Sequence, residues 1–163
     1  FVPTTFIIIN YLSYKKDIIK VMERDKQDGL GTVYYAMSLF ILTIVSFGIY
    51  HNPALGLAPT LVMAYGDGLA ALIGKKIKSK KYKLGDSKKS FAGSITMFII
   101  ATLVIGGYLI YEHTSPVFFG TTHWSCTTIL AAFMITALEA ISVKGTDNIT
   151  VPLGTLSLLL LLG

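Results

Sequence analysis

Long apolar runs separated by short charged segments constrain the fold of this chain more than any other feature of its sequence. Of its 163 residues, 53% are hydrophobic and only 14% are charged, and the mean hydropathy is +0.64. Soluble domains of this size rarely carry so much apolar surface. The runs lack the strict alternation of barrel strands, and backbone groups in lipid must be paired internally. The sequence therefore predicts an all-α, polytopic membrane protein.

About six transmembrane segments are predicted within a single integral membrane catalytic domain, residues 1–163. The predicted segments are 1–14, 32–51, 54–74, 90–111, 122–142 and 150–163. The chain opens and closes inside apolar runs, so we expect the first and last segments to be cut short and further helices to flank them. Asn52-Pro53 predicts a tight turn between the second and third segments.

The segment at 75–89 is strongly basic and sets the predicted orientation. Its lysines are Lys75, Lys76, Lys78, Lys80, Lys81, Lys83, Lys88 and Lys89. The positive-inside rule places this segment in the cytoplasm. Counting outward then places 15–31 and 142–148 on the cytoplasmic side, and 51–53 and 112–121 on the other side. The formal charge of +5 arises from this one loop without an aromatic-basic surface, so nucleic-acid binding is not predicted.

Three carboxylates gather on the cytoplasmic side of this topology. Asp67 lies inside the third segment, about 10 Å from Lys75 by helical rise. Glu139 lies about one turn from the inner end of its helix, and Asp147 follows in the next cytoplasmic loop. Intramembrane acids are costly and usually functional, although a helix-end acid can also reach interfacial water or pair with a lysine. Hard oxygen ligands beside a basic loop predict a site for a metal-bound polyphosphate.

Small residues surround Asp67 in the sequence. Gly66, Ala70 and Gly74 recur every four residues, so a neighbouring helix can approach closely and leave the carboxylate in a narrow cleft. Helix packing alone also explains these glycines. It does not explain the aspartate.

The start of the fourth segment has the features of a phosphate site. Lys88 and Lys89 directly precede it, Ser90 is a candidate N-cap, and Gly93 permits close backbone approach. Free amides at a helix N-terminus, a hydroxyl and two lysines would together cradle a phosphate. The alternative is that the lysines only set orientation and contact anionic headgroups.

The order of these motifs resembles that of a known family. The motifs are Asp67-x-x-Ala70-x-x-x-Gly74, then Lys89-Ser90-x-x-Gly93-Ser94, then Glu139-Ala140-Ile141-Ser142 leading to Asp147-Asn148-Ile149-Thr150-Val151-Pro152-Leu153. Together they resemble the CTP-dependent lipid kinases, which include polyprenol, dolichol, phytol and diacylglycerol kinases, over essentially the whole chain. Two features depart from the family: Ala92 stands where many members have Glu, and the family's N-terminal helices are not part of this sequence.

This resemblance implies transfer of the γ-phosphoryl group of CTP to the hydroxyl of a lipid alcohol in the bilayer, with Mg²⁺ as cofactor. It assigns Mg²⁺ to Asp67 with Glu139 or Asp147. Either Asp67 or, second, Glu139 would be the catalytic base. The residues expected to bind CTP, through its phosphates or its nucleoside, are Gly74, Lys75, Lys88, Lys89, Ser90, Gly93 and Asn148.

Three other functions stay open from the sequence. Phosphatidate cytidylyltransferases share a D-x-x-A element and would make CDP-lipid, but the chain lacks their H-G-G-x-x-D-R-x-D type signature. An ion-coupled transporter would use Asp67 and Glu139 as a relay, but no internal repeat is present. A small structural membrane protein would leave the clustered acids unexplained. The acceptor lipid and the oligomeric state are also left open.

Overall fold

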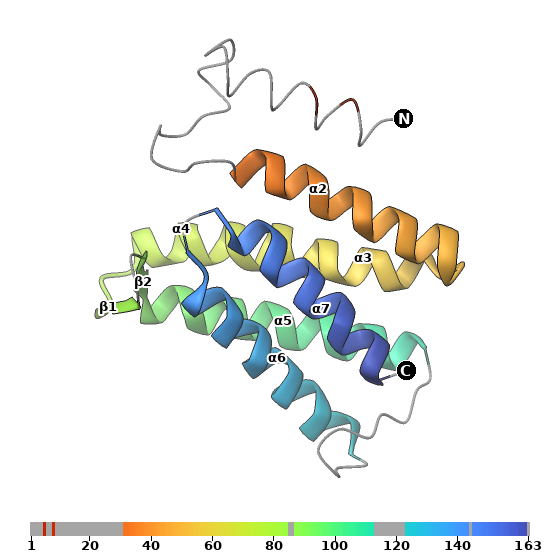
Figure 1. The fold of residues 1–163 in the computed structure, drawn as a ribbon. Coiled ribbons are helices and arrows are strands. Elements are labelled where there is room, and N and C mark those ends of the chain that lie inside the picture. Colours follow the sequence, from red (N-terminus) through yellow and green to blue (C-terminus); the bar gives the residue numbers. More distant parts are fainter. Residues whose placement is uncertain are drawn as a thin grey trace.

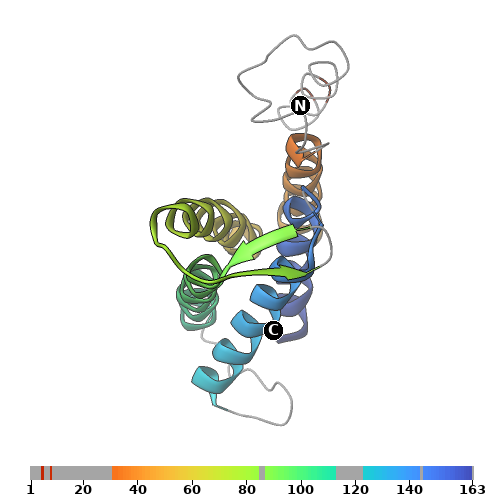
Figure 2. The ribbon, with the colours of Figure 1, turned by 90° about the vertical axis from the view of Figure 1, so that its left-hand side faces the viewer.

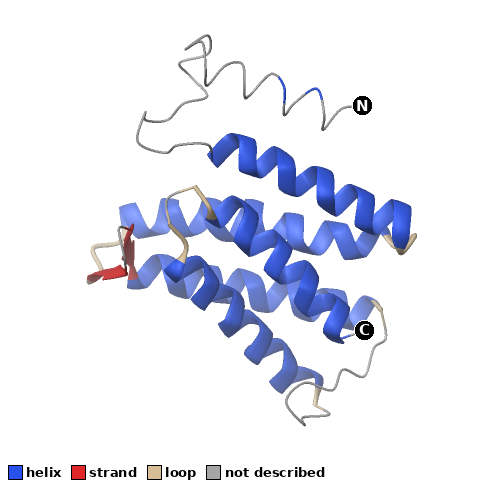
Figure 3. Cartoon of the chain, viewed as in Figure 1, coloured by secondary structure: helices blue, strands red, loops and turns tan. Residues whose placement is uncertain are grey.

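A computed structural model describes residues 31–84, 87–112, 123–143 and 145–162, together with Thr5 and Ile8. For Ser87 and Lys88 it describes the backbone only. The described part is a bundle of helices with one short hairpin at its end (Figures 1 and 3). The elements are α2 (Gly31–Thr43), η1 (Ile44–Ile49), α3 (Pro53–Leu61), η2 (Val62–Asp67), α4 (Gly68–Lys76), β1 (Lys81–Leu84), β2 (Ser87–Ser90), α5 (Phe91–Tyr111), α6 (Trp124–Ile141) and α7 (Asp147–Leu162).

Four helices in the described residues are long and apolar enough to cross a membrane. They are Gly31–Ile49, Pro53–Lys76, Phe91–Tyr111 and Trp124–Ile141, and they overlap the second to fifth predicted segments. The predicted span 1–14 lies outside the described residues except for Thr5 and Ile8, and α7 is a shorter apolar helix of 16 residues. The all-α prediction agrees with the bundle, but six spans are not confirmed.

Helix α7 lies between α2 and α6 and also packs against α3 (Figure 1). Its buried residues include Val151, Thr155 and Leu159, which are at most 1% exposed. On α5, Met97, Ala101 and Ile105 are fully buried in the same core cluster. The interior is therefore continuous across helices that lie far apart in the sequence.

The predicted turn at Asn52-Pro53 is confirmed. The Asn52 side chain accepts hydrogen bonds from the amides of Ala54 (3.0 Å) and Leu55 (3.3 Å), and Pro53 occupies the first helical position. The Asn52 amide also donates to Glu112 at 3.0 Å. This bond joins the start of α3 to the end of α5, both at the bundle end opposite the hairpin.

The small-residue stripe lets α4 and α5 approach closely, as the sequence predicts. A Cβ on Gly66 would lie 2.5 Å from Met97 Sδ, and a Cβ on Gly93 would lie 3.0 Å from the Ala70 carbonyl. A Cβ on Gly74 would collide with the Ser90 hydroxyl. Larger residues would therefore push the start of α5 away from α4.

The hairpin is the part of the fold that sequence reasoning missed, because residues 75–89 were expected to form a loop. Strands β1 and β2 pair antiparallel, with Tyr82 opposite Lys89 and Lys83 opposite Lys88. Seen from the end of the bundle, the two strands extend from the end of α4 and the start of α5 towards α6 and α7 (Figure 2). The lysine-rich segment is thus held across the end of the bundle.

Candidate functional site

The three acids predicted to bind metal lie together at the hairpin end of the bundle. Asp67 ends η2, Glu139 lies in the last turn of α6, and Asp147 begins α7. One carboxylate oxygen from each lies within 4.8 Å of the others. The bundle therefore brings acids from three separate helices to one point.

Asp67 reaches this point through an irregular helical turn. It is the last residue of η2, a π-helical segment between α3 and α4. Such segments are rare and often occur at functional sites, because they redirect the residues that follow. Pro59, a few residues earlier inside α3, has no amide hydrogen to donate, so regular helical bonding is already interrupted upstream of η2.

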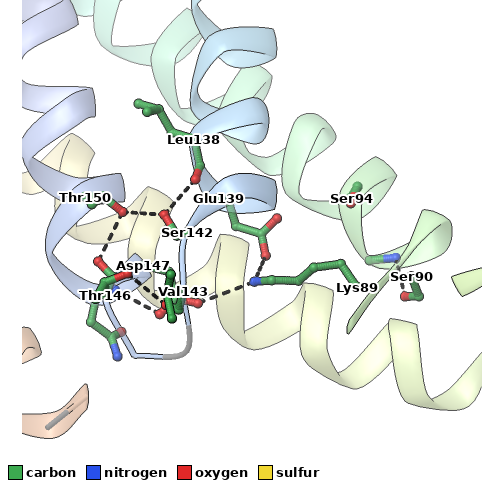
Figure 4. Close-up of polar contacts among 12 residues, drawn as sticks. Lys89, Ser90, Ser94, Leu138, Glu139, Ser142, Val143, Thr146, Asp147 and Thr150 are labelled. Atoms are coloured by element: carbon green, nitrogen blue, oxygen red, sulfur yellow. Dashed lines mark hydrogen bonds and ion pairs between the residues drawn. The ribbon is translucent and has the colours of Figure 1, made fainter. Parts of the chain in front are cut away.

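A short connection between α6 and α7 positions the other two acids. The Ser142 hydroxyl donates to the Leu138 carbonyl and contacts the Thr150 hydroxyl, both at 2.6 Å (Figure 4). The Thr150 hydroxyl in turn donates to the Thr146 carbonyl at 3.1 Å. These bonds fix the end of α6 relative to the start of α7, and so fix Glu139 relative to Asp147.

Glu139 is a buried acid with one unsatisfied oxygen. The residue is 3% exposed, and its Oε1 accepts a hydrogen bond from Lys89 Nζ. Its Oε2 is buried and has no hydrogen-bond partner among the residues that the structure describes. An unpaired buried carboxylate oxygen is costly, and a bound cation would satisfy it.

Lys89 reaches from β2 into the group of acids (Figure 4). Its Nζ donates to Glu139 and lies 3.4 Å from Asp147 Oδ2. Burial alone would lower the pKa of Lys89, but the attraction of Glu139, Asp147 and Asp67 outweighs it and raises the pKa above its ordinary value. Lys89 is therefore a charged group beside three carboxylates. One lysine does not neutralise three acids, and the donor set of carboxylate oxygens suits a divalent cation.

The start of α5 differs from the cradle of free amides that the sequence predicted. Ser90 is the N-cap, as expected, and its hydroxyl accepts from the Gly93 amide at 3.1 Å. The amide of Ala92 donates to the Ser79 hydroxyl (3.2 Å), and the amide of Phe91 donates to the Lys80 carbonyl (3.1 Å). Because the hairpin leads directly into the helix, protein groups pair three of the amides that a phosphate would have needed.

The other predicted nucleotide-binding residues have different surroundings. Lys75 is exposed in the last turn of α4, and the side chain of Lys88 lies outside the described part. Asn148 is half-buried at the start of α7, and its carbonyl accepts from the Ser38 hydroxyl at 2.6 Å. Ser38 is fully buried and was not singled out in the sequence. It connects α2 to the helix start that carries Asp147.

Comparison with known proteins shows that the chain is similar to phytol kinases. Over 152 residues the chain is 36% identical to the phytol kinase of Synechocystis sp., a match covering 90% of this chain and 60% of that protein. It is 30% identical to the probable phytol kinase 1, chloroplastic, of Glycine max and 29% identical to phytol kinase 1, chloroplastic, of Arabidopsis thaliana. Those matches cover 93% and 92% of this chain and 51% of each relative. The chain thus spans between about half and 60% of the length of these curated relatives. No family model and no solved structure matches it.

Proposed function

Because the chain belongs to the lipid kinase family that contains the phytol kinases, we propose that it is a CTP-dependent lipid kinase. The reaction would transfer the γ-phosphoryl group of CTP to the hydroxyl of a membrane lipid alcohol and leave CDP. The names of the relatives favour phytol as acceptor, with polyprenol and diacylglycerol as the other members of the same class of substrate. CTP as donor rests on the motif resemblance.

The observation that carries this proposal is the group of three carboxylates, Glu139 buried and Asp67 and Asp147 half-buried, beside Lys89 at one end of an apolar bundle. Phosphoryl transfer requires positioning and charge neutralisation more than covalent chemistry from the protein. Asp67, Glu139 and Asp147 would hold Mg²⁺, and the unpartnered Glu139 oxygen supports this assignment. When bound, Mg²⁺ would neutralise charge on the nucleotide phosphates.

Side chains of this protein would bind the phosphates and the nucleotide and accept the proton. Lys89 keeps its positive charge at neutral pH and lies where a polyphosphate could replace one of its carboxylate partners. Lys75 and Lys88, near the same end, are proposed to contact phosphates, and Asn148 a nucleotide oxygen. Asp67 is the first choice as acceptor of the proton from the lipid hydroxyl, because it is half-buried rather than fully enclosed.

The position of the site suits a substrate with a hydrophobic tail. Glu139 lies near the end of one helix that is long and apolar enough to cross a membrane, and Asp67 lies inside another. A lipid alcohol could keep its chain in the bilayer while its hydroxyl meets a water-soluble nucleotide. The positive-inside rule supports a cytoplasmic location for this end of the bundle.

One experiment tests the proposal against its nearest alternative. Purified protein is incubated with Mg²⁺, a panel of lipid alcohols and phosphatidate, and CTP labelled in either the γ or the α phosphate. Label from the γ position in the lipid is the expected result, and it should be lost in excess chelator and be much weaker with ATP. Label from the α position would instead identify a cytidylyltransferase.

A variant decides whether the acids are responsible. Asp67→Asn keeps the shape of the side chain and removes its charge, so γ-phosphoryl transfer should fall at least ~10²-fold, as for loss of an electrostatic stabiliser. Asp147→Asn should behave in the same way. Near wild-type rates in both variants would leave the carboxylates with a packing role only.

A further inference from the structure

The hairpin has two faces that differ in what they contact. Directly opposite residues of an antiparallel pair project their side chains to the same face. Tyr82 is opposite Lys89, so these two share a face, whereas Lys81 and Lys83 project to the other face and are exposed. On the face that carries Tyr82 and Lys89, these two side chains are half-buried against the rest of the protein.

Tyr82 attaches this face to α5. Its hydroxyl forms a hydrogen bond of 2.6 Å with the Ser94 hydroxyl, one turn into the helix. Its ring contacts the Phe91 ring edge to face, with centroids 5.2 Å apart. A phenylalanine at position 82 could keep the ring contact, but only tyrosine can make the bond to Ser94.

Lys89 needs such an anchor to remain at the acids. A lysine side chain has many rotamers, so its ammonium group stays at one point only if its backbone is fixed. The β2 backbone at Lys89 is paired with that of Tyr82, and the Tyr82 side chain is bonded to α5. The chain of contacts therefore runs from Ser94 through Tyr82 to Lys89 and the carboxylates of Glu139 and Asp147.

We propose that Tyr82 is a positioning residue that holds Lys89 against the carboxylates through its hydrogen bond to Ser94. The consequence for nucleotide binding rests on the proposed function, whereas the position of Lys89 does not. The contacts described for Tyr82 are with Ser94, Phe91 and, through the strand pairing, the backbone of Lys89. Its removal should thus act on the acids through Lys89.

Amine labelling measures the position of Lys89 without any need for activity. The full-length chain in detergent is treated briefly with an acylating reagent, and the labelling rate of each lysine is read by mass spectrometry. Tyr82→Phe and Ser94→Ala should each raise the rate at Lys89 about fivefold, the factor for one lost hydrogen bond of about 1 kcal/mol. The double variant should show no further rise, because both changes remove the same bond. Ser94→Thr, which keeps a hydroxyl, should label like the wild type.

Two controls separate this role from general loosening. Lys81, on the outer face of the same hairpin, should label at the same rate in every variant. Tyr111→Phe removes a tyrosine hydroxyl at the far end of the bundle and should leave Lys89 unchanged. An unchanged Lys89 rate in Tyr82→Phe and Ser94→Ala, additive effects in the double variant, or a parallel rise at Lys81 would each overturn the proposal.

Kinetics then connect the position of Lys89 to catalysis. In an active preparation, Tyr82→Phe and Ser94→Ala should raise the apparent KM for CTP about fivefold and change kcat less, because an existing lysine is only displaced. If the wild type transferred no phosphoryl group, the proposed function would fail while the labelling result would still decide the role of Tyr82. If labelling rose but KM stayed the same, the positioning role in nucleotide binding would be refuted.

Discussion

Replacing Glu139 by glutamine tests whether the acidic group is built for a cation. The change keeps the shape of the side chain and removes its charge. The Glu139 carboxylate faces two other carboxylates within 4.8 Å and the Lys89 ammonium. At an effective dielectric constant of about 20, each carboxylate at that separation repels it by about 3.5 kcal/mol, about 7 kcal/mol together. Attraction to the ammonium at an ordinary hydrogen-bond distance is about 6 kcal/mol on the same scale.

These opposing terms nearly cancel, so Glu139→Gln should change the free energy of unfolding of the metal-free protein by no more than about 2 kcal/mol. A bound cation removes this balance, because it attracts all three carboxylates. Saturating Mg²⁺ at about 100 times its dissociation constant would stabilise the wild type by about 2.7 kcal/mol. The variant should gain much less, and its phosphoryl transfer should fall at least ~10²-fold.

The assay is thermal unfolding followed by far-UV circular dichroism, in chelator and in excess Mg²⁺. Glu112→Gln is the matched control, because it removes one negative charge at the opposite end of the bundle, where Asn52 is its partner. It should retain the full Mg²⁺ effect. Equal stabilisation of Glu139→Gln and wild type by Mg²⁺ would refute the cation site. A severe loss of stability in chelator would mean that Glu139 serves mainly as the structural partner of Lys89.

Three further predictions use other parts of the described structure. Gly74→Ala should destabilise the protein by about 1–3 kcal/mol, since its Cβ collides with the Ser90 hydroxyl, whereas Gly68→Ala has open space and should be neutral or slightly stabilising in the same melts. Lys89→Ala should raise the apparent KM for CTP or lower turnover ~10-fold or more, while the exposed Lys78→Ala stays within about twofold in steady-state kinetics. Burial lowers the pKa of Lys89, but the neighbouring carboxylates outweigh burial, so the pKa is raised in the folded protein. The ion pairs of Lys89 therefore contribute fully to stability below its ordinary pKa of 10.5, and this contribution is lost as pH rises through the higher folded pKa. The melting difference between wild type and Lys89→Met should therefore stay constant from about pH 7 to pH 9 and shrink only in stronger base.

Features that depend on neighbours along the chain were predictable from the sequence. The Asn52-Pro53 turn and the Ser90 cap are both present, since each depends on bonds made within three residues. The gathering of Asp67, Glu139 and Asp147 at one end followed from counting helix reversals. The lengths of the apolar runs and the charge bias of the loops are sufficient to predict which residues lie at the same end of the bundle.

Features that depend on distant contacts were not predictable. Lys81-Tyr82-Lys83-Leu84 does alternate in polarity, but four residues with two lysines are too few to indicate a strand. The pairing of β1 with β2 is supported by the contact of Tyr82 with α5, and no local sequence pattern predicts this contact. Likewise, Lys89 and Glu139 are 50 residues apart, so their bond depends on how the helices pack. Lys89 was predicted to bind phosphate. Pairing of an intramembrane acid with a lysine was left open as the alternative, but the sequence did not indicate that Lys89 contacts both Glu139 and Asp147.

The π-helical turn that ends at Asp67 acts as a change of helical phase. In a regular α-helix each residue advances about 100° around the axis. Before η2, the helix Pro53–Lys76 packs through α3 against α7, and after it the helix packs through α4 against α5. The wider turn lets one continuous helix serve both neighbours and still present Asp67 to the acids of α6 and α7. Insertions and deletions between Val62 and Gly66 therefore rotate Asp67 around the helix axis, which substitutions do not. Loss of a single residue there would leave the segment hydrophobic, yet it would turn Asp67 and the α4 residues that follow it about a quarter of the way around the axis relative to α3, and so separate the carboxylates.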